Sequence, residues 1–570
     1  MAGTAWLLEL SPQPVCTREL SGVHVGRAAS ELRAVRTTER SADRGLRTRG
    51  ACSRGTARVG QRTRLAGAAA AGRTALREGI EARAGQIKEQ EELSGVRATA
   101  QQISFADWEL IRQSDQGVSL EPLLEAISAF LDDQRDIIGR IRRDLVRGLK
   151  RPDSGRNGLT ATQILRSLVL MRVKNWDYRE LRERIADGLT LRRFADFYCA
   201  PVPKHDAFQR GFVRLTPQTL KAVNDLVVRA AVELELEDGA KLRVDTTVVQ
   251  TNIHHPTDNT LLWDVVRVVT RLVRRLAKAL ELPRIKGFCD RTRSARRRMY
   301  EIQRMTTRQR HEQQIATYRM LIGIAEEVVG NARAGLEKTR KMHGKDMFAD
   351  IAIEELRRQI EHFCGLGDRV IDQTRRRVLD GEQVPTNEKI YSIFEPHTDL
   401  IKRGKVRAPV EFGHKVFLAE SAKGLITQYD VLKGNPPDEL HVASSLQRHK
   451  QAFGRAPELY GSDRGFFSEQ NLASCKHGGV KLVCIPQRGG KRTTRREAYE
   501  SSAAFKQGQR FRAGIEGRIS VLFRGRGMKR CLAEGRDRFE LWVGAAVLAN
   551  NLMRIATMLL KQSSRRRQAA

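Results

Sequence analysis

Residues 1–95 lack the side chains from which a folded core is built. Their only aromatic residue is Trp6, and they hold fifteen arginines, one lysine and many Ala, Gly, Ser and Thr. Such a segment cannot bury enough apolar area to offset the entropy of ordering it, so we expect it to be disordered. An Arg-rich extension is typical of a DNA-binding arm. The alternative is that translation starts further down, for instance at Val96, and that this stretch is upstream sequence read as protein.

Paired cysteines and long apolar runs are also missing. The eight cysteines are scattered without CxxC spacing, which argues against a zinc site or a disulfide frame and predicts reduced thiols in a cytoplasmic protein. The most apolar stretch, 539–560, is interrupted by Glu540, Asn550, Asn551 and Arg554, so we expect a buried helix and no membrane span. The N-terminus has neither the basic region nor the apolar core of a secretion signal.

Acidic residues are far fewer than basic residues. The chain has 67 Asp and Glu against 102 Lys and Arg, which gives 570 residues a formal charge of +35. Folding does not need such a surplus, and the surplus raises self-repulsion, so it favours a polyanionic partner such as nucleic acid. The alternative is a solvated basic surface.

A helical region is predicted for residues 103–235. Apolar residues recur at helical spacing, and a helical block over 160–186 begins at Thr160, a residue type that caps helices. The stretch 189–212 has the rhythm of a helix-turn-helix, although any small helical bundle shares it. We therefore predict a helical N-terminal DNA-binding region.

An α/β unit follows. Polar and apolar residues alternate over 241–246, which predicts a strand with Asp245 on its polar face. Residues 261–395 return to helical spacing and are predicted to be a helical insertion, after which short strands alternate with helices. The predicted strands are 241–246, 414–420, 425–432, 458–462 and 480–485.

Three carboxylates stand at positions suited to metal-dependent phosphodiester chemistry. Asp245 lies in the first strand, Asp463 follows a later strand, and Glu516 lies on the helix after the last strand. Two divalent cations can activate an oxygen nucleophile and stabilise the leaving oxygen, and Mg²⁺ prefers carboxylate ligands. The carboxylates that compete with this set are Asp258, Glu411 and Asp430.

Four sequence blocks carry a resemblance to a known family. They are residues 244–258, 411–417, 462–466 and 512–520. In this order they resemble the blocks of bacterial insertion-sequence DDE transposases of the ISNCY type. The resemblance covers roughly residues 103–560.

The resemblance implies an α/β fold with an RNase H-like catalytic core, formed by 240–260 and 408–530. The helical insertion 261–395 then interrupts this core, and 531–570 form a C-terminal helix and basic tail. The implied activity is DNA cleavage and strand transfer at the inverted-repeat ends of an insertion sequence. Two Mg²⁺ or Mn²⁺ ions, held by Asp245, Asp463 and Glu516, would serve as cofactors.

The implied partners are double-stranded DNA, as terminal repeats and as target, and further copies of the chain in a synaptic complex. The implied location is the nucleoid in the bacterial cytoplasm. The alternatives are an RNase H-fold nuclease that does not join strands, or a decayed copy that binds DNA without cutting.

The family pattern is incomplete on the last helix. Related transposases carry Tyr, Arg, Glu and Lys along it; here Arg512 and Glu516 match, whereas Gln509 and Phe523 stand at the Tyr and Lys positions. Arg512 and Glu516 are four residues apart and share a helix face, which a plain surface ion pair would also do.

A basic loop and two histidines complete the candidate site. We expect the cations of the loop 487–496, together with Arg512, to contact DNA phosphates. These loop cations are Arg488, Lys491, Arg492, Arg495 and Arg496. His254, His255 and Arg464 lie near the first two carboxylates in the sequence, and we expect them to contact substrate or support the site; structural roles are the alternative for the histidines.

Overall fold

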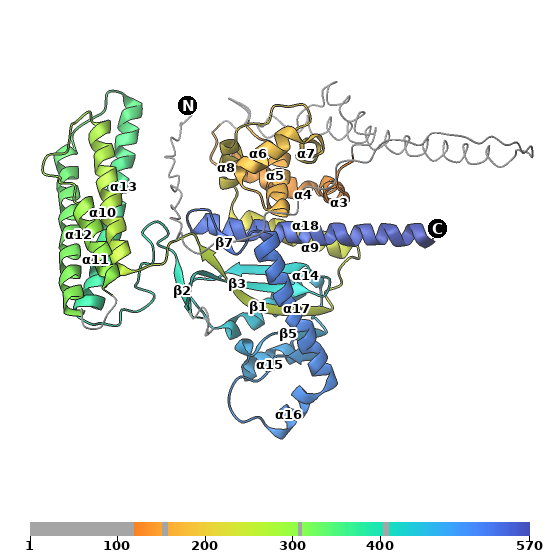
Figure 1. Ribbon diagram of the computed structural model, residues 1–570. Helices are drawn as coiled ribbons and strands as arrows, with labels where there is room; N and C mark the ends of the chain where they lie inside the picture. Colours follow the sequence, from red (N-terminus) through yellow and green to blue (C-terminus); the bar gives the residue numbers. More distant parts are fainter. Residues whose placement is uncertain (1–118, 151–157, 306–310, 403–409, 570) are drawn as a thin grey trace, which may run out of the picture. The chain divides into compact units, whose positions relative to one another are not determined.

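The computed structural model describes residues 119–150, 158–305, 311–402 and 410–569 (Figure 1). Within them the chain is a mixed α/β protein, mostly helical, with one mixed sheet. The α/β class predicted from the sequence is therefore confirmed at this level. The extension 1–95, for which we predicted disorder, lies outside the described residues.

In the described part of the chain, seven helices precede the sheet. They are α3 (Pro122–Asp132), α4 (Arg135–Val146), α5 (Ala161–Lys174), α6 (Tyr178–Asp187), α7 (Leu189–Phe194), α8 (His205–Val213) and α9 (Pro217–Glu233). Thr160 caps α5 as predicted, since its hydroxyl accepts a hydrogen bond from the Gln163 backbone N–H at 3.1 Å. The helical block predicted for 160–186 is present as two helices, α5 and α6. Asn175 adopts a left-handed conformation (φ 58°) that ends α5, and the Asp177 side chain then caps α6.

The sheet is built around β1 (Lys241–Thr251). On one side β1 pairs antiparallel with β3 (Val410–Ser421), which forms a hairpin with β4 (Ile426–Val431) and also pairs with β2 (Asp399–Lys402). On the other side β1 pairs parallel with β5 (Leu459–Gly461), and β5 pairs parallel with β6 (Leu482–Cys484). The predicted strands are thus present, and β1 runs five residues beyond the predicted end at 246.

The long insertion is a four-helix bundle. Its helices are α10 (Asp258–Ala279), α11 (Thr292–Arg304), α12 (His311–Thr339) and α13 (Met347–Thr374), followed by the short π-helix η2 (Arg375–Leu379). Figure 1 shows the four helices side by side, and α10 packs against each of the other three. The bundle has its own apolar core, which includes Val265, Val269, Leu321 and Ile360.

Helices cover both faces of the sheet. Between the later strands lie η3 (Asp438–His441), α14 (Val442–Phe453), η4 (Arg464–Phe466) and α15 (Glu469–His477). After β6 come α16 (Thr494–Ser501), α17 (Ala503–Gly525), β7 (Arg530–Cys531) and α18 (Arg536–Ala569). One apolar cluster joins the sheet to α14 and α15, and another joins it to α17 and α18.

The last helix is shared between two cores. Phe539 and Val543 of α18 pack on the sheet, whereas Leu552 and Ile555 pack with the N-terminal helices. By length and composition alone, Arg536–Gln568 could cross a membrane, and it is the one such helix in the described part of the chain. Because 67% of its most apolar window is buried inside the protein, its apolar character is accounted for as a core helix.

His449 is a buried titratable group that ties α14 to the start of β1. Its Nε2 donates a hydrogen bond to the Gly239 carbonyl at 3.0 Å, and its ring stacks on Phe453. Burial lowers the pKa of His449 from 6.5 to about 4. The folded protein therefore resists a proton that the unfolded chain accepts.

We expect acid to destabilise the protein through His449. Between about pH 6.5 and pH 4 only the unfolded state binds this proton, so the free energy of unfolding should fall by about 3 kcal/mol as the pH drops through that window. Chemical denaturation at several pH values measures the loss. A His449→Gln variant, which does not titrate there, should lose correspondingly less, and identical pH profiles for the two proteins would contradict the assignment.

Candidate active site

One arginine joins the three predicted carboxylates. The Arg512 guanidinium lies 3.0 Å from the Asp245 carboxylate, 3.7 Å from that of Asp463 and 3.3 Å from that of Glu516. A single Arg512 nitrogen, Nη2, contacts both aspartates, so these two side chains converge on one point. Residues that are more than 200 positions apart in the sequence thus meet at one cation.

The strand pairing brings the two aspartates together. β1 and β5 run parallel, with Arg243 opposite Gly461, and Asp463 follows directly after β5. Asp245 lies two residues beyond Arg243 on β1. The Asp463 side chain also accepts the Gly465 backbone N–H at 2.9 Å, which orients its carboxylate at the start of η4.

α17 crosses the ends of the neighbouring strands. The Gln509 side-chain amide donates to the Cys484 carbonyl at 2.7 Å and to the Ser462 carbonyl at 3.3 Å, so it bridges β6 and the segment after β5. Gln509, Arg512 and Glu516 are spaced to lie along one side of α17. Gln509 therefore holds the helix in place at the site.

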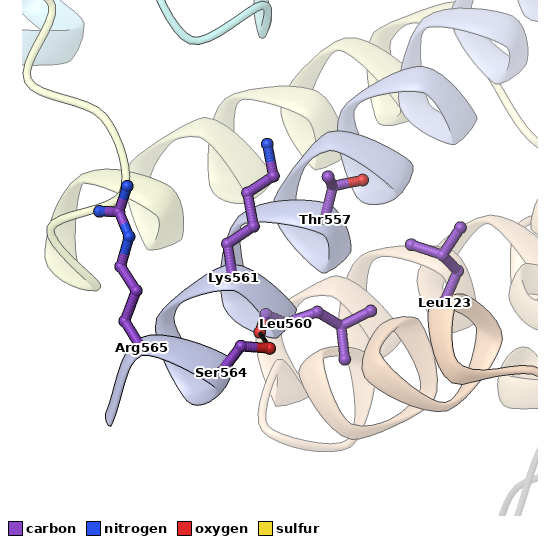
Figure 2. Close-up of a pocket in the computed structure, with 6 residues that line it drawn as sticks. All are labelled: Leu123, Thr557, Leu560, Lys561, Ser564 and Arg565. Carbon is purple, nitrogen blue, oxygen red and sulfur yellow. Dashed lines mark hydrogen bonds between the residues drawn. The ribbon is translucent and has the colours of Figure 1, made fainter. Parts of the chain in front are cut away.

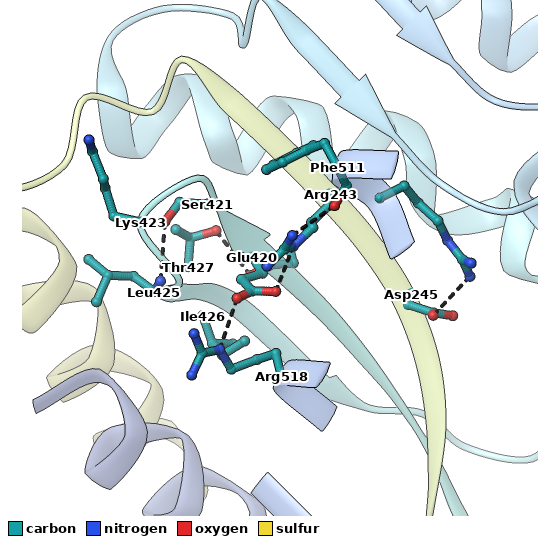
Figure 3. A network of polar contacts seen from close by, with 12 residues as sticks. Arg243, Asp245, Glu420, Ser421, Lys423, Leu425, Ile426, Thr427, Phe511 and Arg518 are labelled. Atoms are coloured by element: carbon teal, nitrogen blue, oxygen red, sulfur yellow. Dashed lines mark hydrogen bonds and ion pairs between the residues drawn. The ribbon is translucent and has the colours of Figure 1, made fainter. Parts of the chain in front are cut away.

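A buried carboxylate fixes α17 to β1. Glu420 of β3 has no exposed side-chain surface and binds Arg243 of β1 at 2.7 Å and Arg518 of α17 at 2.9 Å. Figure 3 shows both guanidiniums reaching Glu420, with Asp245 further along β1. Arg243 also donates to the Phe511 carbonyl at 2.7 Å. A Cβ at Gly514 would lie 2.2 Å from the Arg243 guanidinium, so glycine leaves the room that this contact needs.

Solvent exposure of the site rises from Asp245 to Glu516. The side chains of Asp245, Asp463 and Glu516 are 12%, 37% and 69% exposed, and that of Arg512 is 16% exposed. Three negative charges therefore surround one positive charge, partly withdrawn from water. The Arg512 Nε–H is buried and has no hydrogen-bond partner among the described residues.

The chemical type of these side chains suits a divalent metal ion. Three carboxylates surround a position that already holds positive charge, which is the donor set that Mg²⁺ or Mn²⁺ prefers. As the side chains stand, no three His, Cys, Asp or Glu in the described part of the chain are close enough to hold one ion. Asp245, Asp463 and Glu516 are instead gathered around Arg512.

No family model, no curated protein and no solved structure matches this chain. What the site can do chemically therefore follows from its own side chains. Carboxylates that converge on one point can bind divalent metal ions, which in turn can bind an anionic ester.

The structure adds a fourth carboxylate, Asp438, at the start of η3. Its Oδ1 accepts a hydrogen bond from the Thr246 hydroxyl at 3.0 Å and lies 2.7 Å from the Lys415 ammonium. A Cβ at Gly465 would lie 3.0 Å from a carboxylate oxygen of both Asp438 and Asp463, so Asp438 is a neighbour of Asp463. Asp438 is not among the carboxylates predicted from the sequence, because an aspartate that follows two prolines carries no signal beyond the start of a helix.

The competing carboxylates lie elsewhere. Asp430 on β4 binds Lys221 at 2.9 Å and Arg448 at 2.7 Å. Asp258 starts α10 and pairs with Arg377 in the bundle. Glu411 lies on β3 opposite Ile401 of β2, and it is not among the groups around Arg512.

His254 and His255 do not contact Asp245, Asp463 or Glu516 in the described structure. His254 lies 3.4 Å from Asp264 of the bundle, and His255 packs edge-on against Phe412. Both follow the end of β1, beyond the part of the strand that carries Asp245. Arg464, which directly follows Asp463, is exposed and forms no ion pair with any residue that the structure describes.

The basic loop divides into two groups. Arg496 is only 14% exposed and binds Glu500 at 2.7 Å, and Arg492 lies 3.2 Å from the same carboxylate. Arg496 also lies over the rings of Phe467, Tyr499 and Phe505, so it supports the fold of this loop. The exposed cations without an ion pair to a described residue are Arg488, Lys491 and Arg495.

An open pocket lies on other elements. Figure 2 shows it between Leu123 of α3 and the end of α18. Thr557, Leu560, Lys561, Ser564 and Arg565 complete its lining. It contains no carboxylate and no residue of the candidate site.

Proposed function

We propose that this chain is a DDE transposase that cleaves DNA at the inverted-repeat ends of an insertion sequence and joins those ends to target DNA. The observation that carries the proposal is the convergence of Asp245, Asp463 and Glu516 on Arg512. The charge of +35 supports DNA as the partner. The family resemblance of the four blocks around these residues supports the same reaction.

The sheet supports an RNase H-like core. A central strand carries the first aspartate, an antiparallel hairpin lies on one side, and two short parallel strands lie on the other. The second aspartate follows the first of these parallel strands, and the glutamate comes from the helix that crosses their ends. The carboxylates therefore meet beyond the C-terminal ends of β5 and β6, next to the central strand β1, and this chemistry requires such a convergence.

Each group has a proposed role. Asp245 and Asp463 would hold divalent ions, and Glu516 would complete the set. Two such ions, when bound, supply activation of water or a 3′-hydroxyl and stabilise charge on the leaving oxygen. Arg512 holds the carboxylates together against their mutual repulsion.

The remaining surfaces have proposed partners as well. We propose that α3–α9 bind the terminal repeats and that exposed Arg488, Lys491 and Arg495 contact phosphates beside the site. Two or more copies would bind paired ends in a synaptic complex.

A strand-transfer assay tests the proposal. The full chain is incubated with Mg²⁺, a duplex that carries the inverted repeat found beside the gene, and a circular target plasmid. We expect cleavage at the repeat end and covalent joining of that end to the plasmid. Cleaved ends that never become joined would favour a nuclease, and binding without cleavage in either Mg²⁺ or Mn²⁺ would favour a decayed copy.

A further inference from the structure

A row of cations follows the outer side of α10. Between residues 267 and 278, every α10 side chain that is not buried is Arg or Lys. We call this row the α10 stripe. Its members are Arg267, Arg271, Arg274, Arg275 and Lys278. At 1.5 Å per residue the stripe is about 16 Å long, which matches several successive phosphates of a DNA strand.

Most of this charge is not offset within the protein. Arg267 pairs with Asp264 at 2.7 Å, and Arg274 pairs with Asp290. The side chains of Arg271, Arg275 and Lys278 make no ion pair or hydrogen bond to any other residue in the described ranges. The Nε–H of Arg271 is also buried without a hydrogen-bond partner there.

Burial and the neighbouring positive charges make the charged form of Arg271 less stable. Burial, followed by the charges of Arg275 and Arg267, lowers the pKa of Arg271. Like charges at a spacing of four residues destabilise a helix. A protein surface that keeps three cations together without an acid is therefore arranged for an external polyanion.

Several other arginines of the bundle are paired with acids. Arg297 and Arg298 of α11 both pair with Glu301, Arg333 binds Asp368, and Arg376 binds three separate acids. These side chains belong to surface networks that are neutralised internally, unlike the three unpaired cations of the α10 stripe.

We propose that the α10 stripe binds the phosphate backbone of duplex DNA, which makes the bundle a DNA-binding arm of the enzyme. This inference rests on the proposed function for the identity of the polyanion. α10 begins shortly after β1, the strand that carries Asp245, so the arm is joined to the catalytic strand by a short connection. Base edges are not involved, so binding through the stripe is independent of sequence.

The test compares two double variants of the full chain that remove the same charge. Arg271 and Arg275 are replaced by Gln in one, and the internally paired Arg297 and Arg298 are replaced by Gln in the other. Affinity is measured over a range of salt concentrations for a repeat-bearing duplex and for an unrelated duplex. Two lost phosphate contacts should flatten the slope of log K against log salt by about two and weaken binding of both duplexes about tenfold to thirtyfold at physiological salt.

The Arg297/Arg298 variant should bind both duplexes almost as the parent does. Thermal unfolding checks that each variant is folded, and loss of repulsion should leave the Arg271/Arg275 variant at least as stable as the parent. Equal slopes for the two variants, or a loss confined to the repeat-bearing duplex, would overturn the proposal. The proposed chemistry is tested by a different measurement. If Asp245→Asn still cleaves DNA, the proposed active site is wrong, whatever the salt dependence of DNA binding by the α10 variants.

Discussion

The Asp245→Asn and Asp463→Asn variants should each cleave repeat-bearing DNA at least about a thousandfold more slowly than the parent protein. Asparagine keeps the size of the side chain but removes the negative charge that would hold a divalent ion, and losing an ion removes several kcal/mol of transition-state stabilisation. Single-turnover cleavage in Mg²⁺ measures the effect. DNA binding should remain near the parent value, because phosphate contacts come from the basic surface.

Two further variants make this result specific. Asp430→Asn changes a carboxylate of β4 that binds Lys221 and Arg448, and it should cleave like the parent. Glu516→Gln should be as defective as the aspartate variants, although its side chain is the most exposed of the three. If Glu516→Gln cleaves normally while Asp245→Asn is inactive, Asp438 becomes the carboxylate to replace next, because it neighbours Asp463.

Glu420→Ala should lower the free energy of unfolding by about 3–5 kcal/mol. Removal of this carboxylate leaves Arg243 and Arg518, which are 12% and 15% exposed, without the partner that offsets their burial. Because the same contacts hold α17 on β1, the variant should also lose cleavage activity under conditions in which it is still folded. Denaturant unfolding and the cleavage assay measure the two effects independently.

A surface ion pair provides the matched control for Glu420. Glu337 lies 3.7 Å from Arg340, and both side chains are about three-quarters exposed. Because exposed pairs contribute little, Glu337→Ala should change the stability by less than about 1 kcal/mol and leave cleavage unaltered. A Glu420→Ala protein as stable as Glu337→Ala would mean that the buried pair does not anchor the helix.

Local sequence patterns were sufficient to predict much of the fold. Alternation over 241–246 located β1, and the predicted strands 414–420 and 425–432 located β3 and β4. The Thr160 cap located the start of α5. Each of these signals is carried by residues that are neighbours in the chain, so no tertiary information is needed to interpret it.

The contacts of the site depend on pairs that sequence spacing does not reveal. Arg512 was predicted to pair with Glu516 four residues away, but its contacts with Asp245 and Asp463 depend on how β1, β5 and α17 pack. Asp438 joins the site for the same reason. Arg496 illustrates the opposite case, because its charge predicted a DNA contact whereas the folded loop directs it onto Glu500.

The bundle inserted after β1 also has a consequence for how the chain folds. β1 and β3 are adjacent in the sheet, yet the whole bundle separates them in the sequence, so their pairing requires the closure of a very long loop. Contacts inside the bundle are more local, and Asp258 at its start pairs with Arg377 at its end. A bundle that folds first therefore brings its two ends together and shortens the loop that the sheet must close. Thr251 and Thr398, whose hydroxyls lie 3.0 Å apart, complete that closure at the edge of the sheet.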